Sequence, residues 1–183
     1  EAVEAVVDGA ACILLDDSEA LDGSTLWLDP LAATAAVDQA LRDASCSPNL
    51  RRQAGIVVRS GALRDLHDVA LCLGLGANAI NPYAILAVGL GISPRPPREA
   101  LSDEAIETRL NNTLNALTVG VQKVTSTIGC HELRGYGLSF SSIGLSAPVA
   151  DLFGTPNYFG SAERGITWER LQQDAELRAA EVR

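Results

Sequence analysis

The chain has 183 residues, of which 47% are hydrophobic, and it carries 23 acidic against 14 basic side chains. This composition supplies the core of one ordinary domain and excludes a disordered or fibrous protein. The net charge of −9 also excludes nucleic acid as a partner, because such affinity rests on Lys and Arg that neutralise phosphates.

The N-terminal region predicts neither a signal peptide nor a membrane anchor. Acidic residues stand where a signal peptide would carry positive charge, and no apolar run reaches the roughly 18 residues of a bilayer span. We therefore expect a soluble, cytoplasmic protein without a membrane partner. The chain lacks methionine and begins with Glu1, so we expect a processed product or a piece of a longer polypeptide.

The four cysteines are predicted to be reduced thiols. They stand at Cys12, Cys46, Cys72 and Cys130. No two of them form a C-x-x-C pair, and a domain of this size does not need disulfides for stability. Cys12 and Cys72 lie within apolar segments, so we expect both to be small core residues.

The first third of the chain alternates strand and helix signals. A helix end at 2–7 precedes an aliphatic run at 11–15, which predicts a buried strand that ends in the acidic pair Asp16 and Asp17. Asp29 and Pro30 then predict an N-cap and first turn of a helix that ends near position 45.

The same alternation continues to position 83. A second aliphatic run at 55–58 predicts a strand, and leucines at helical spacing over 63–73 predict a helix that stops at Gly74 and Gly76. Residues 77–83 predict a brief third strand or turn. Strands separated by helices of this length are typical of βαβ units, so the predicted fold class is α/β, with a parallel sheet flanked by helices.

The second half predicts two more helices around a loop-rich segment. Three prolines within 92–98 predict an exposed connector. Ser102 caps a long helix, and glycines and small polar residues over 129–144 predict loops. A final amphipathic helix is expected at about 167–183. The predicted core face of the long helix consists of Ile106, Leu110, Leu114, Leu117 and Val121. We expect a single domain over 1–183.

The residues that could carry chemistry do not form a recognisable catalytic set. Asp17 ends a strand, where ligand sites of α/β proteins tend to lie, but no base or metal cluster accompanies it. His67 is expected to pack on the apolar side of its helix. Lys123, with Ser126 nearby, is either a phosphate or carboxylate contact or a solvated lysine at a helix end. An autonomous enzyme is therefore the least favoured interpretation.

Two segments nevertheless carry a resemblance to a known family. Residues 74–83, GLGANAINPY, are similar to G-Y-G-A-x-A-I-N-P-Y of the central domain of the glutamate synthase large subunit. Residues 123–129, KVTSTIG, are similar to its K-V-M-S-K-M-G stretch, and Phe153, Gly154 and Thr155 resemble its closing F-x-G-T with one residue fewer. The resemblance runs through nearly the whole chain and enters the family domain partway.

The resemblance implies a scaffold rather than a catalyst. The family domain is an α/β unit similar to an incomplete, rudimentary TIM barrel, and it joins a glutaminase domain to an FMN-binding domain. The resemblance therefore implies no cofactor and no catalytic residue in this chain, with FMN and an iron–sulfur cluster expected only in neighbouring domains. Glutaminase and FMN-binding domains are the expected partners.

The departures from the family pattern affect basic and polar positions. The second histidine of the family motif is Asp68 here, the second lysine is Thr127, and an arginine near the end is Tyr158. Glycines and apolar positions persist. Lost basic residues remove interdomain ion pairs or anion contacts.

Two functions from different classes follow. The first is a structural connector of a glutamate synthase-like protein, whose parent reaction is the glutamine-dependent reductive amination of 2-oxoglutarate, with the isolated chain inactive. The alternative is a stand-alone protein that binds a small molecule or anion at its strand ends. The candidate ligand or interdomain contacts are Asp17, His67, Asn81, Lys123 and Ser126.

Overall fold

The computed structural model of the chain describes residues 1–20, 27–46, 48–92, 101–133, 136–137, 139–160 and 165–182. The elements up to the third strand are α1 (Ala2–Val7), β1 (Cys12–Asp16), α2 (Pro30–Asp43), the short 3-10 helix η2 (Leu50–Arg52), β2 (Gly55–Arg59), α3 (Leu66–Gly74) and β3 (Ala79–Asn81). The later elements are α4 (Tyr83–Gly89), α5 (Asp103–Thr127), β4 (Ser142–Ile143), α6 (Ala147–Phe153), β5 (Asn157–Tyr158) and α7 (Trp168–Val182). Most of the connector expected at 92–98 lies outside the described residues.

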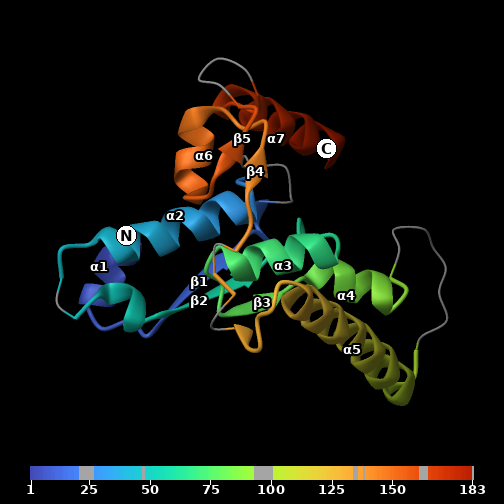
Figure 1. Cartoon of the computed structure of the whole chain (residues 1–183). Helices are drawn as coiled ribbons and strands as arrows, with labels where there is room; N and C mark the ends of the chain where they lie inside the picture. Colours follow the sequence, from blue (N-terminus) through green and yellow to red (C-terminus); the bar gives the residue numbers. More distant parts are fainter. Residues whose placement is uncertain are drawn as a thin grey trace.

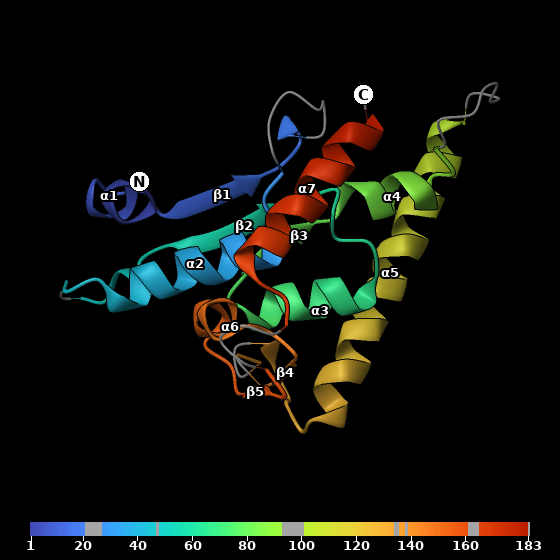
Figure 2. The same ribbon diagram turned by 90° about the horizontal axis from the view of Figure 1, so that it is seen from above.

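A three-stranded parallel sheet forms the centre of the fold. Its strand order is β1-β2-β3, with Ile13 opposite Ile56 and Val58 opposite Ile80. Helices α2 and α3 connect the strands and flank the sheet (Figures 1 and 2). The predicted α/β class with a parallel sheet flanked by helices is therefore confirmed.

The hydrophobic core lies between the helices and one face of this sheet. Alternate strand residues such as Ile56 and Val58, 0% and 1% exposed, pack with Leu41 of α2 and Cys72 of α3. Each fully buried aliphatic side chain contributes about 1.5–3 kcal/mol relative to an exposed one. The placement of Cys72 in the core agrees with the sequence prediction.

The opposite face of the sheet is much more accessible. Leu14, in the middle of β1, is 57% exposed, and Cys12 is also exposed. The predictions of a buried first strand and of a core role for Cys12 are therefore wrong. The aliphatic run at 11–15 indicates a strand, but successive side chains point to opposite faces, and the described helices cover only one of them.

The starts of α2 and α5 follow the capping signals in the sequence. The Asp29 carboxylate accepts hydrogen bonds from the backbone N–H groups of Leu31 and Ala32, at 2.8 and 3.2 Å. The Ser102 hydroxyl accepts one from the N–H of Ala105 at 3.3 Å. These side chains satisfy donors that the first turn of a helix leaves unpaired.

The long helix α5 buries less of its apolar face than the sequence predicts. Val121 is 8% exposed, whereas Leu114 is 47% exposed, although both belong to the predicted core face. The helix contacts α3 and α4 and extends beyond both (Figure 2). Complete burial of Leu114 is therefore a wrong prediction, because the spacing of apolar residues shows which face is apolar and not what covers it.

The C-terminal elements form a second small cluster beside the sheet. Strands β4 and β5 pair in parallel, and α6 packs against α2 (Figure 1). The Thr167 hydroxyl accepts a hydrogen bond from the N–H of Arg170 at the start of α7. Ala175 of α7 is 5% exposed, so one side of this helix is buried.

An arginine holds the amino-terminal edge of the sheet together. Arg51, only 14% exposed, forms an ion pair with the buried Asp38 and donates to the carbonyl oxygen of Gly76 and the side-chain oxygen of Asn78. Gly76 has a φ of +121°, and a Cβ placed there would lie 2.5 Å from the Asp38 carboxylate. The glycine is therefore required by both its backbone conformation and its neighbour.

Candidate functional site

The carboxyl-terminal edge of the sheet holds the densest polar cluster around a predicted site residue. Asp17, directly after β1, accepts hydrogen bonds from the Ser60 hydroxyl at 2.5 Å and the Tyr83 hydroxyl at 2.8 Å. It also accepts from the N–H of Gly61 at 3.0 Å and the indole N–H of Trp27 at 3.3 Å. One carboxylate therefore joins segments that follow all three strands and the segment that precedes α2.

The parallel sheet explains why these residues meet. The carboxyl ends of parallel strands lie at one edge, so Asp17, Ser60 and Tyr83 come together although they are far apart in the sequence. Backbone bonds reinforce the edge, from Asp17 N–H to the Arg59 carbonyl at 3.2 Å and from Ser60 N–H to the Asn81 carbonyl at 3.1 Å. Asn81, the last residue of β3, therefore lies at the same edge of the sheet as Asp17.

A glycine gives the tyrosine access to Asp17. A Cβ at Gly61 would lie 2.7 Å from the Tyr83 ring. Burial and the neighbouring Asp17 carboxylate raise the pKa of Tyr83 from 10.0 to about 12. The phenol is therefore a neutral hydrogen-bond donor throughout the physiological range.

An exposed ion pair lies beside this cluster. Arg59 binds the Asp16 carboxylate at 2.8 Å, and its guanidinium lies 5.3 Å from the centre of the Tyr83 ring. The backbone N–H of Ser18, followed by the Arg59 guanidinium, lowers the pKa of Asp16 below its usual 3.8. The Arg59 guanidinium, which lies at the carboxyl-terminal edge of the sheet, is therefore already paired with the Asp16 carboxylate.

The chemistry of this edge is that of a structural junction. The Asp17 carboxylate is engaged by four protein donors, and a general base needs lone pairs that can reach a substrate proton. Asn81 is exposed and pairs with β2 in register with Arg59. Asp17 and Asn81 were expected as candidate contacts from the sequence, and their role as ligand contacts stays a prediction. Ser60 and Tyr83 were not among the predicted residues, because single hydroxyl residues carry no spacing signal.

The structure places His67 in the first turn of α3, where its side chain is exposed. The expectation that His67 packs on the apolar side of its helix is therefore wrong. The buried residues of that helix are Val69, Ala70, Cys72 and Gly74. His67 is adjacent in sequence to the apolar stripe and lies outside it, on the solvent side of the first turn.

Lys123 and Ser126 lie on exposed positions of α5. The same helix presents Val121, Gln122 and Thr125 to a pocket, and Lys123 and Ser126 are absent from its lining. The structure therefore does not bring these two residues into a common pocket with Asn81.

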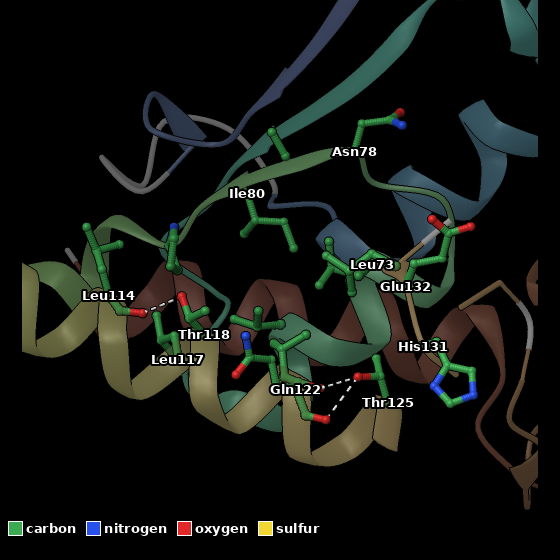
Figure 3. A pocket seen from close by; sticks show the side chains of 15 residues that line it. Leu73, Asn78, Ile80, Leu114, Leu117, Thr118, Gln122, Thr125, His131 and Glu132 are labelled. Atoms are coloured by element: carbon green, nitrogen blue, oxygen red, sulfur yellow. Dashed lines mark hydrogen bonds between the residues drawn. The ribbon is translucent and has the colours of Figure 1, made fainter. Parts of the chain in front are cut away.

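That pocket lies between α3, β3 and α5 and has a volume of about 470 Å³ (Figure 3). Its lining residues are Val69, Leu73, Asn78, Ala79, Ile80, Pro82, Leu114, Leu117, Thr118, Val121, Gln122, Thr125, His131, Glu132 and Leu133. Ile80 points from β3 towards the α5 side chains. The volume falls in the range of ordinary ligand pockets, which is about 300–1,000 Å³.

The threonines of this pocket contribute little polarity. Thr118 donates its hydroxyl hydrogen to the Leu114 carbonyl at 2.8 Å, and Thr125 donates to the carbonyl of Val121 or Gln122 (Figure 3). Because both hydroxyls are bonded to backbone carbonyls of α5, they are not free to bond a ligand, and the threonine methyl groups add to the apolar lining. Most of the described lining is therefore apolar, and Asn78, Gln122, His131 and Glu132 are its larger polar side chains.

A second pocket, of about 440 Å³, lies between the start of α2 and α7. Both tryptophans of the chain, Trp27 and Trp168, line it, together with Leu171 and Ala175 of α7. The sequence carries no signal for this pocket, because the two tryptophans are far apart in the chain. The amphipathic pattern of the final helix indicated only that one face would meet a surface.

The described part of the chain brings no three His, Cys, Asp or Glu side chains together in a way that could hold a metal ion. Among the helices that the structure describes, none combines the length and apolar character needed to cross a bilayer.

Comparison with known proteins gives one consistent result. The family model described as "Glutamate synthase central domain" matches residues 1–146. The chain is 29% identical over 186 residues to the "Glutamate synthase [NADPH] large chain" of Bacillus subtilis, covering 100% of this chain and 11% of that protein. It is 30% identical over 187 residues to the protein of the same name from Azospirillum brasilense, covering 100% and 12%. The chain thus spans about a tenth of the length of these curated relatives.

Proposed function

The chain belongs to the family of glutamate synthase central domains, and from this membership we propose that it is a structural connector within a larger glutamate synthase-like polypeptide. The parent reaction would be the glutamine-dependent reductive amination of 2-oxoglutarate to glutamate. The proposed role of this chain is to hold a glutaminase domain and an FMN-binding domain at a fixed separation, without a catalytic residue of its own.

The observation that carries this proposal is the structural role of residues in the family-like motif. Gly76 accommodates Asp38, Gly74 lies against the Phe140 ring, and Asn78 accepts a hydrogen bond from the Ile56 N–H at 2.9 Å. Tyr83, the last residue of the motif, binds Asp17. These residues build the two edges of the sheet, as expected for a motif that preserves a scaffold.

We further infer that the sheet is one part of a larger barrel-like arrangement. Consecutive strands are neighbours, and the helices pack on one face while Leu14 on the other face is 57% exposed. In a closed parallel barrel, helices surround the outside and the other face of the strands lies inside. The uncovered face of this sheet would then correspond to the inner side.

The redox chemistry is assigned to neighbouring domains. An iron–sulfur cluster needs several thiolates in one place, and no three Cys, His, Asp or Glu side chains of the described residues come together in that way. We propose that FMN and any such cluster bind outside this segment, in a cytoplasmic enzyme.

The size of the native polypeptide tests the connector role. An antibody raised against residues 102–183 is used to blot an extract of source cells, and the band is expected to be several times larger than the 19.2 kDa of this chain. The isolated chain is expected to hydrolyse no glutamine. A native band near 19 kDa, or glutamine turnover by the purified chain, contradicts the proposal.

The alternative, a stand-alone small-molecule or anion-binding protein, receives support only from the pocket beside β3. The proposed anion contacts Lys123 and Ser126 are outside that pocket, and the cation at the carboxyl edge is paired. Thermal shift against FMN, phosphate, glutamate and 2-oxoglutarate tests it. A ligand at ten times its Kd should stabilise the fold by about 1.4 kcal/mol.

A further inference from the structure

We propose that the pocket between α3, β3 and α5 receives an extended polypeptide segment, which pairs with β3 and inserts aliphatic side chains between the two helices. This inference goes beyond the connector role, because it names a surface, a backbone conformation and a side-chain pattern. The inference does not depend on the connector role, because a segment of any partner protein with this chemistry could bind in the pocket.

The first support is the position of β3 at the edge of the sheet. In the described residues β3 pairs with β2 on one side and with no strand on the other. An edge strand presents backbone N–H and C=O groups that can pair with an added strand. The pocket runs along this strand, because Asn78, Ala79, Ile80 and Pro82 all line it.

The second support is the apolar wall that faces this edge. Leu114, Leu117 and Val121 of α5 and Leu73 of α3 line the pocket together with Ile80 of β3. Figure 3 shows the Ile80 side chain directed towards α5. Leu114 remains 47% exposed in the chain alone. Aliphatic side chains of an added strand would cover these surfaces and remove them from water.

The combination favours a peptide over a compact small molecule. A strand next to β3 would lie about 4.8 Å from it and would point every second side chain towards the α3 and α5 wall. Strand pairing satisfies the backbone groups of the edge, while the pocket receives the alternate side chains. Neither feature alone requires a peptide, but a small apolar molecule would leave the edge groups unpaired.

Charge indicates what the remaining side chains of the segment should be. Among the described residues that line the pocket there is one carboxylate, that of Glu132, and no Lys or Arg, and the whole chain carries a net charge of −9. An acidic segment would be repelled by this field, whereas Lys or neutral residues would be favoured. The predicted occupant therefore alternates Val, Ile or Leu with Lys or Thr.

The test uses the full chain and a panel of fluorescein-labelled peptides of about seven residues, with Val, Ile or Leu alternating with Lys or Thr. Binding is measured by fluorescence anisotropy. We expect the best peptide to bind, and methylation of its alternate backbone nitrogens to weaken binding at least about tenfold, because strand pairing needs those N–H groups. Hydrogen exchange of the Ala79–Asn81 amides should slow in the complex.

Two matched variants of α5 locate the site. Leu114→Glu places a charge in the pocket wall and should weaken the best peptide by about tenfold or more. Val119→Glu is the control, because Val119 is on the same helix, is 54% exposed and does not line the pocket. Circular dichroism checks that both variants are folded.

Several results would overturn the proposal. If no peptide of the panel binds at about 1 mM, the pocket is not a peptide-binding groove. Equal affinity of the N-methylated peptide would show side-chain insertion without strand pairing. A dimer of the chain that Leu114→Glu dissociates, without peptide binding, would assign the pocket to a second copy. None of these outcomes depends on the size of the native polypeptide.

Discussion

Replacement of Asp17 by alanine tests whether this carboxylate joins the strand ends as the structure indicates. The substitution removes the common acceptor of four donors, which come from segments up to 66 residues apart in sequence. We expect a stable but weakened fold, because the hydrophobic core lies on the helix side of the sheet and is unaffected.

The magnitude depends on which donors water can reach. Ser60 is 1% exposed, so the loss of its acceptor leaves a buried hydroxyl with a poorer partner, at a cost of about 1–3 kcal/mol. Tyr83 and Gly61 are only partly buried, and water can replace the carboxylate there. We therefore expect Asp17→Ala to lower the free energy of unfolding by about 3 kcal/mol, well below the sum over four charged hydrogen bonds.

Urea unfolding measures this effect directly. Fluorescence follows the transition, because Trp27 is buried and its indole N–H donates to Asp17. The denaturant midpoint should fall with an unchanged slope. Asp16→Ala is the matched control, since the neighbouring carboxylate forms only an exposed ion pair with Arg59, and such pairs contribute little.

Equal effects of the two alanine variants would refute this reasoning. It would also fail if Asp17→Ala changed the free energy of unfolding by less than about 1 kcal/mol, because the buried serine would then not need its acceptor. A double-mutant cycle with Tyr83→Phe should give a coupling energy of about 1 kcal/mol or more. Additive effects would mean that the contact between these two side chains contributes no stability.

Three further predictions follow from single side chains and one glycine. Tyr83, whose pKa is raised by burial and by Asp17 to about 12, should ionise above the usual tyrosine value of 10.0 when followed by ultraviolet absorbance. Its neutral form stabilises the fold below pH 10, and this contribution should disappear as pH rises from 10 to 12. Gly76→Ala should lower the free energy of unfolding by about 2 kcal/mol or more, because of its φ of +121° and the Asp38 contact, whereas Gly137→Ala, with open space around it, should change it little by chemical denaturation. Cys72, whose pKa is raised by burial to about 11, should react with a thiol reagent only after unfolding, while the exposed Cys46 should react at once in the folded chain.

The local signals in the sequence predicted helices α1, α2, α3, α5 and α7 and strands β1 to β3, but they did not predict α4, α6, β4 or β5. Asp29 followed by proline marked the start of α2, Ser102 marked the start of α5, and two aliphatic runs marked β1 and β2. These signals are reliable because capping and strand formation depend on residues within a few positions of one another. The family resemblance was likewise readable, and the family match confirmed it.

Only the tertiary structure decided which faces are buried and which polar groups meet. Leu14 and Leu114 are apolar residues at positions that the sequence pattern assigns to a core, yet each lies on a face that no described element fully covers. Ser60 and Tyr83 meet Asp17 because parallel strands bring their carboxyl ends to one edge, a contact between distant residues that leaves no local pattern. The sequence by itself therefore determined the alternation of strands and helices up to β3, the helices α5 and α7, and the family. Packing determined the junction at Asp17 and the pocket beside β3, because burial depends on what lies across from a side chain.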